Sequence, residues 1–191
     1  QSACADVGVA VPSDKDASYV IGMGLAEALA HAAPGLARER YPELGNRYRH
    51  HYVAKQHEIV LFEGILAMLQ ALKERRHWLG VATGKSRRGL DEALQSVELK
   101  DLFDATRTAD ETASKPDPLM LVELMEELDV EPARTLMIGD TTHDLQLAAN
   151  AGTARIGVGY GAHDSTEFAP FEPLHVAHSV ADLHGWLLRH A

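Results

Sequence analysis

The sequence contains a single cysteine, no long apolar run and no excess of basic residues. With Cys4 as its only thiol, the chain cannot form an internal disulfide, which fits a reducing, cytoplasmic setting. No apolar stretch approaches the ~18 residues that a membrane-spanning helix needs, and there is no signal-peptide pattern. We therefore expect a cytoplasmic protein with no membrane partner.

Basic residues are scarce as well, with 18 Lys and Arg against 28 Asp and Glu and a formal net charge of -10. Binding to nucleic acid calls for a basic face, so this balance argues against a nucleic-acid partner. Small anionic substrates remain open, because a local cationic site can exist in an acidic protein. The 191 residues suffice for one sizeable core plus a small accessory domain.

Residues up to about Ile59 carry helical patterns and no strong strand signal. Apolar residues at helical spacing predict one helix through the stretch DASYVIGMGLAEALAHAAPG, capped by Asp14 or Asp16 and ended by Pro34. A second helix, rich in Arg, Tyr and His, is predicted over about residues 36–57, with Pro42 and Gly45 as candidate positions for a break. Its histidines (His50, His51 and His57) lie among basic residues, so we interpret them as a solvated helix face instead of a metal site.

From about residue 60 onward, short apolar runs alternate with helical segments. Strands are predicted at 77–83, 103–108, 135–139 and 154–161, and helices at 65–75, 86–97, 118–128, up to 151, and 181–190. Such alternation predicts an α/β fold with a Rossmann-like parallel sheet and helices on both faces. Ligands of such sheets bind at the carboxyl ends of the strands.

The residues that follow three of these strands could carry chemistry. Thr83, Gly84 and Lys85 follow the first strand, Lys115 follows the second, and Asp140 and Asp144 follow the third. A hydroxyl, ammonium groups and two carboxylates would then meet at one edge. Together they could hold a divalent cation and a phosphoryl group.

Two like charges as close as Asp140 and Asp144 need either a proton or a cation between them. Mg²⁺ prefers oxygen ligands and needs only a few carboxylates plus a substrate phosphate. The alternative for Asp144 is helix capping, because Thr141 followed three residues later by an acid approximates a capping box.

The cationic residues also have two interpretations. Thr83 and Gly84 precede a helix N-terminus, which is a natural anion site, and Lys85, Arg87 and Arg88 oppose the helix dipole unless an anion is bound. A solvated basic turn is the alternative for the two arginines. Lys115 opens the stiff segment KPDP, with Asp117 expected as the cap of a helix that starts at Pro118.

With these strand ends in place, the sequence resembles the haloacid dehalogenase-like hydrolases, in particular the phosphoglycolate phosphatase-like branch. GVATGK resembles the second motif of the family, SKPDP its third and IGDTTHD its fourth. The resemblance implies a helical cap domain at residues 1–62 and a phosphatase core at 63–191. It also implies a Mg²⁺-dependent phosphatase that acts on a small phosphorylated metabolite through an aspartyl phosphate.

The resemblance further implies roles for individual residues. Asp140 would ligate Mg²⁺, and Asp144 would do so through water or by orienting Asp140. Thr83 and the Gly84 amide would hold phosphate oxygens, with Lys85 beside them. Lys115 would stabilise the nucleophile and the phosphoryl group.

One family motif is missing: an apolar strand followed by D-x-D-G-[TS], which carries the nucleophile. The nearest imitation, VGVAVPSDKDAS, has Ala17 where glycine is required, so Asp14 and Asp16 are better explained as helix caps. We therefore expect the nucleophile and the central strand to precede Gln1. The 191 residues alone should be inactive, with two neighbouring strands left unpaired.

A second departure is Glu63, where related sequences carry proline.

Competing interpretations remain. GVATGKS suggests a phosphate-binding P-loop, but only three residues separate Gly80 from Gly84 and the motif needs four. A non-catalytic or regulatory member of the fold is the main alternative, because the nucleophile is missing. Another reaction of the same superfamily would depend on residues of the cap, where Arg47, Tyr48, His50 and His51 could face a leaving group.

Overall fold

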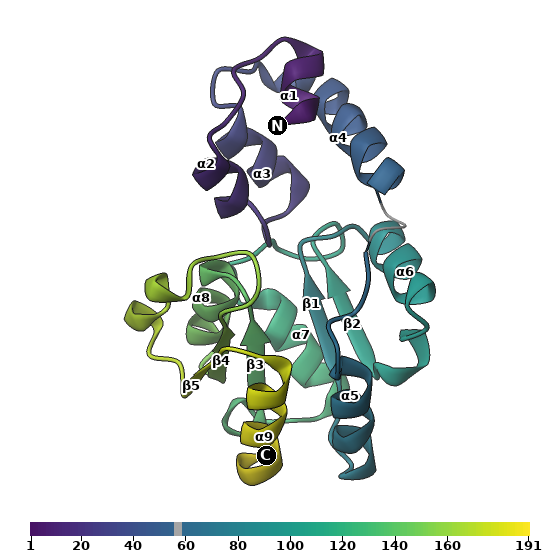
Figure 1. Ribbon diagram of the computed structural model, residues 1–191, viewed down its shortest axis with the longest axis vertical. Coiled ribbons are helices and arrows are strands. Elements are labelled where there is room, and N and C mark those ends of the chain that lie inside the picture. The colour runs from purple at the N-terminus through teal and green to yellow at the C-terminus, as the bar shows by residue number, and fades with distance from the viewer. Residues whose placement is uncertain (56–58) are drawn as a thin grey trace.

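The computed structural model describes residues 1–55 and 59–191, and it has two parts (Figure 1). In residues 1–55, called the helical part below, helices and loops are present and no strand. The helices are α1 (Ser2–Val7), α2 (Asp14–Tyr19), α3 (Leu25–Ala32) and α4 (Tyr41–Lys55), with a 3-10 turn at Arg38–Arg40. They bury an apolar cluster of their own, made of Ala3, Cys4, Val7, Leu29, Ala33, Leu36 and Leu44.

The single helix predicted from Asp14 to Pro34 is wrong, because the structure breaks it into α2 and α3. Residues 20–24 form a loop in which Gly22 has a φ of +95° and Gly24 is the N-cap of α3. Glycine weakens a helix interior and tolerates positive φ, so the backbone can leave the helix here. The apolar spacing of Val20 and Met23 was therefore misleading. The resulting 20–24 loop reaches the other part of the molecule.

The second part, residues 63–191, alternates strands and helices as predicted. Its strands are β1 (Gly80–Thr83), β2 (Ala105–Thr108), β3 (Leu136–Gly139), β4 (Ala154–Val158) and β5 (His175–Ala177). Its helices are α5 (Ile65–Glu74), α6 (Arg87–Ser96), α7 (Leu119–Leu128), α8 (Thr142–Asn150) and α9 (Val180–His190), with short 3-10 turns between several of them. β5 was not predicted, because it has only three residues.

All strand pairs are parallel, which confirms the α/β fold class, but they form two separate sheets. β1 pairs with β2, and β3, β4 and β5 form the second sheet in that order. In the part of the chain that the structure describes, β1 and β3 therefore each keep one edge without a strand partner. This is the division that we expected if a central strand is missing between them.

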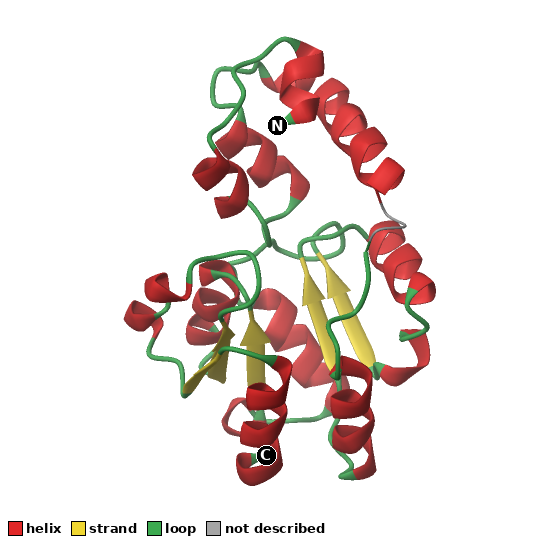
Figure 2. Ribbon diagram, viewed as in Figure 1, coloured by secondary structure: helices red, strands yellow, loops and turns green. Residues whose placement is uncertain are grey.

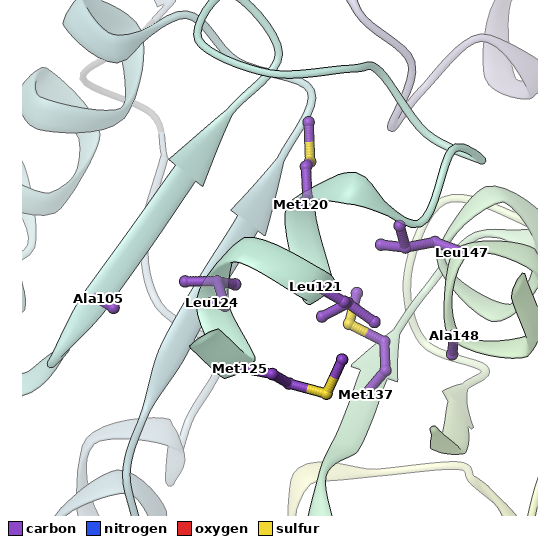
Figure 3. Close-up of a cluster of buried hydrophobic side chains, with 8 residues drawn as sticks. All are labelled: Ala105, Met120, Leu121, Leu124, Met125, Met137, Leu147 and Ala148. Carbon is purple, nitrogen blue, oxygen red and sulfur yellow. The ribbon is translucent and has the colours of Figure 1, made fainter. Parts of the chain in front are cut away.

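Helices on both faces hold the two sheets together. Figure 3 shows α7, with Met120, Leu121 and Leu124, packed between Ala105 of β2 and Met137 of β3. On the other face, α5 and α9 form a second cluster with β4 and β5; its buried members are Met68, Leu72, Ile156, Val158, Ala177, Leu183 and Leu187. Apolar packing against these helices therefore connects the two sheets, which share no strand pairing among the described residues.

The strands point their carboxyl ends toward the helical part. Figure 2 shows the arrowheads of β1, β2 and β3 directed at α1–α4.

The start of α7 differs slightly from the prediction, because Pro118 is the N-cap and the Asp117 carboxylate accepts a hydrogen bond from the Leu119 amide at 2.9 Å. Among the described residues, we find no helix whose length and apolarity would let it cross a membrane.

Candidate active site

Lys115 and Asp144 form a buried ion pair just beyond the ends of β2 and β3. The Lys115 Nζ lies 2.6 Å from Asp144 Oδ1, and the two residues are only 7% and 4% exposed. The other oxygen of Asp144 accepts hydrogen bonds from the Thr141 amide at 3.1 Å and the Thr141 hydroxyl at 2.8 Å. Asp144 therefore completes the capping box of α8 and also neutralises Lys115.

Asp140 directly follows β3 and is more accessible than Asp144. Its Oδ2 accepts a hydrogen bond from the Ala162 amide at 2.9 Å, and its backbone carbonyl accepts one from the His163 amide at 3.1 Å. Gly161 packs so tightly against this carboxylate that a Cβ there would overlap it. The loop after β4 thus fixes the position of Asp140.

Thr83 and Gly84 end β1 in a tight turn. The Thr83 hydroxyl accepts a hydrogen bond from the Lys85 amide at 3.2 Å. A Cβ on Gly84 would lie 2.6 Å from the Gly22 carbonyl oxygen and closer still to that of Met23. Only glycine therefore permits this close approach of the 20–24 loop to β1.

The 20–24 loop contacts all three predicted strand ends, which shows that they converge. It touches Gly84 after β1, its Gly24 amide donates a hydrogen bond to the Ser114 hydroxyl at 2.7 Å, and Gly22 packs against Thr141. We call the residues gathered here the rim: Thr83, Gly84, Ser114, Lys115, Asp140, Thr141 and Asp144. The sequence predicted that the strand ends would meet, but not that a loop of the helical part would meet them.

Two histidines near the rim also anchor the helical part, and the sequence analysis missed both. His143 Nε2 donates to the Tyr19 carbonyl at 2.7 Å, and His163 Nε2 lies 3.2 Å from the same oxygen. Both rings lie against the Tyr19 ring, with centroids 4.9 and 5.9 Å away. Burial lowers the pKa of His143. The position of His143 inside the fourth motif was the only signal available.

Lys85 and its basic neighbours have different partners. The Lys85 side chain crosses to the helical part, where its Nζ lies 2.7 Å from the Tyr52 hydroxyl and 4.5 Å from the centre of that ring. Arg87 instead pairs with Glu111 at 2.6 Å, and Arg88 with Glu92 at 2.8 Å. The two arginines therefore serve ion pairs around α6.

The histidines of α4 do not form a metal site in the structure. His51 pairs with Asp6 at 2.8 Å and its ring lies against that of His50; His57 lies outside the described residues. Over residues 1–55 and 59–191, no cluster of three or more His, Cys, Asp or Glu side chains is arranged to hold a metal.

The rim offers a more limited set of metal ligands. Asp140 is half-buried and has a donor on only one of its side-chain oxygens among the described residues, whereas both oxygens of Asp144 are occupied. A hard cation such as Mg²⁺, which keeps most of its waters, fits this arrangement with Asp140 as direct ligand and Asp144 acting indirectly.

Comparisons with known proteins agree with this fold. The model of the haloacid dehalogenase-like hydrolase family matches residues 1–158. A probable phosphatase, IndB, of Dickeya dadantii is 35% identical over 127 residues, which are 66% of this chain and 55% of IndB. The pyrophosphatase PpaX of Halalkalibacterium halodurans is 30% identical over 171 residues, 88% of this chain and 78% of PpaX.

The phosphoglycolate phosphatase of Vibrio vulnificus is 30% identical over 167 residues, 87% of this chain and 69% of that protein. A crystal structure of a hydrolase from Pseudomonas syringae superposes with a TM-score of 0.89 at 21% identity, covering 99% of this chain and 88% of the other. The parallel α/β fold and these sequence relatives therefore define a protein of the hydrolase type. The chain belongs to the haloacid dehalogenase-like hydrolase family.

Proposed function

We propose that the protein is a Mg²⁺-dependent phosphatase that hydrolyses a small phosphorylated metabolite, phosphoglycolate-like in character. The observation that supports this proposal is that Gly84, Ser114 and Thr141 all contact the 20–24 loop. Their neighbours Thr83, Lys115 and Asp140 therefore lie at the same rim. The relatives named above include a pyrophosphatase and a phosphoglycolate phosphatase. Pyrophosphate and phosphoglycolate share a phosphoryl group next to a second anionic group.

The proposed roles follow from the chemistry of each group. The Thr83 hydroxyl and the Gly84 amide would bind phosphoryl oxygens, and the Lys115 ammonium would offset their negative charge. Asp144 holds that ammonium in place through the 2.6 Å ion pair. Mg²⁺, held by Asp140, would supply further compensation of charge around the phosphoryl group.

We further propose that the nucleophile is an aspartate in residues that precede Gln1, and that it forms an aspartyl phosphate which water hydrolyses. The separation of β1 from β3 supports this, because a strand between them would end at the rim beside Thr83 and Asp140. The helical part would act as a cap that excludes bulk water from the rim.

The test is hydrolysis of p-nitrophenyl phosphate by the full-length gene product, with and without Mg²⁺. We expect turnover that EDTA abolishes, and a loss of at least about 100-fold in kcat for Asp140→Asn. A protein that begins at Gln1, verified by mass spectrometry, should be inactive. If the full-length protein shows no turnover, the alternative of a non-catalytic member of the fold is favoured. Activity of the chain beginning at Gln1 would contradict the proposed position of the nucleophile.

A further inference from the structure

We propose that Lys85 and Tyr52 form a subsite for the leaving group, which selects substrates with a second anion next to the phosphoryl group that is removed. This inference rests on the proposed function and goes beyond it, because it names the specificity-determining residues. Lys85 belongs to the turn after β1, and Tyr52 belongs to α4 of the helical part. The pair is therefore divided between the two parts of the molecule.

The position of Lys85 follows from the rim. Its amide donates to the Thr83 hydroxyl at 3.2 Å, so its backbone is fixed beside the proposed phosphoryl site. Its side chain then extends to the Tyr52 hydroxyl at 2.7 Å. A leaving group must project from the rim toward the helical part, because the carboxyl ends of β1, β2 and β3 face that way (Figure 2). Lys85 lies along that path.

The charge of Lys85 is compensated only weakly in the structure. Arg87, Arg88 and Lys115 each have a carboxylate partner within 3 Å. Lys85 has no carboxylate within 4 Å among the described residues, and its partner is a neutral phenol. An ammonium binds a carboxylate or phosphate more strongly than it binds a phenol. An incoming anion can therefore displace this contact.

Tyr52 supplies a donor for the same anion. A phenol hydroxyl that accepts a hydrogen bond from Lys85 can still donate its own proton. Tyr48, one turn earlier on α4, lies with its ring centroid 6.1 Å from that of Tyr52. The Lys85 ammonium and the Tyr52 hydroxyl can therefore both donate to the same ligand, which favours an anion over a cation at this position.

The experiment compares three substrates of the full-length enzyme: 2-phosphoglycolate, pyrophosphate and p-nitrophenyl phosphate, whose leaving group lacks the second anionic group. For Lys85→Met, we expect the ratio of kcat/KM for 2-phosphoglycolate to that for p-nitrophenyl phosphate to fall at least tenfold. Tyr52→Phe should lower it about threefold. A larger fall for pyrophosphate than for 2-phosphoglycolate would identify a phosphate as the preferred second anion.

Lys55→Met is the matched control, because Lys55 is an exposed lysine at the end of the same helix, and its ratio should stay within twofold. An unchanged ratio in Lys85→Met would overturn the subsite while leaving the phosphatase proposal intact.

Calorimetric titration with 2-phosphoglycolate and with inorganic phosphate, in the absence of metal, separates the two proposals. If the protein hydrolyses none of the esters but Lys85→Met weakens binding of 2-phosphoglycolate at least tenfold more than binding of phosphate, the subsite stands and the phosphatase proposal fails. Equal binding of both probes by the unmodified protein would overturn the subsite.

Discussion

The two halves of the α/β part meet the helical part in different ways. In the half that contains β3, β4 and α8, the polar residues at the strand ends are buried and hydrogen-bonded: Thr141, His143, Asp144 and His163 are 1%, 5%, 4% and 6% exposed. In the half that contains β1, β2 and α6, the polar contacts made by Lys85 and Arg87 are more open. The side chains of Arg87 and Glu111 are 34% and 41% exposed, and Lys85 is partly buried.

This difference separates a fixed contact from an exchangeable one. On the β3 side, His143 and His163 hold the Tyr19 carbonyl, and Asp144 binds its counter-ion Lys115, which comes from the segment after β2. Removing one partner there leaves a buried polar group unsatisfied, which is costly. On the β1 side, the contact with Tyr52 depends on one lysine that has no counter-ion among the described residues. The following three predictions test this comparison, from the largest expected effect to the smallest.

Lys115→Met should be the most destabilising change, because it leaves the Asp144 carboxylate buried without its counter-ion. We expect the free energy of unfolding to fall by about 3–5 kcal/mol, measured by urea denaturation. Lys100→Met, at an exposed lysine, is the control and should change it by less than about 0.5 kcal/mol. The double variant Lys115→Met/Asp144→Asn should recover part of the loss. A fall of less than about 1 kcal/mol in the single variant would show that the buried ion pair is not needed to stabilise the β3 side.

Gly84→Ala should have an intermediate effect, since its Cβ would overlap the carbonyl oxygens of Gly22 and Met23. These are backbone atoms, so relief requires the 20–24 loop to move away from β1. We expect a loss of about 1–3 kcal/mol in thermal denaturation and faster proteolysis within the loop. Gly35→Ala, where a Cβ meets no atom within 4 Å, should be nearly neutral. Equal stability of the two variants would mean that the loop is not held against the rim.

Glu111→Gln should have the smallest effect, and one that depends on pH. The hydrogen bond from Arg87 lowers the pKa of Glu111 to about 2, against 4.5 for the unperturbed group. The pair therefore stabilises the folded state above about pH 4.5, and this contribution is lost as the pH falls toward 2. Because both side chains are about a third or more exposed, we expect a difference below about 1 kcal/mol at pH 7.

The measurement for Glu111→Gln is the melting temperature between pH 2 and pH 7. The two proteins should differ at pH 6–7 and converge near pH 2, with Glu92→Gln as a control at another exposed pair on α6. A difference that stays constant with pH would show that the ionised carboxylate is not responsible.

Much of the α/β part could be predicted from the sequence. The runs WLGVAT and TLMIG indicated β1 and β3, and Ser86 and Thr141 marked the starts of the helices that follow, because local residue preference and apolar periodicity decide these elements. β5 was missed because three residues carry too little pattern. The convergence of the strand ends followed from the rule for parallel sheets.

The partners of individual side chains could not be predicted. Asp144 was expected either to cap its helix or to serve a metal; the structure shows the cap and also the ion pair with Lys115, 29 residues away. Lys85 was expected beside phosphate, and the contact of its side chain with Tyr52 was not predicted. The apolar spacing predicted a helix that continues through Gly22. The structure has a loop there, and this loop contacts Gly84 and Thr141.

The sequence by itself determined which residue types stand at the strand ends and that the strands are parallel, because these depend on short-range pattern and on the chirality of the chain. Only the tertiary structure decided that residues 20–24 meet the rim, that Lys115 is neutralised and that Lys85 reaches the helical part. These contacts join residues 29 to 119 positions apart. Their geometry depends on how whole elements pack, which no local pattern encodes.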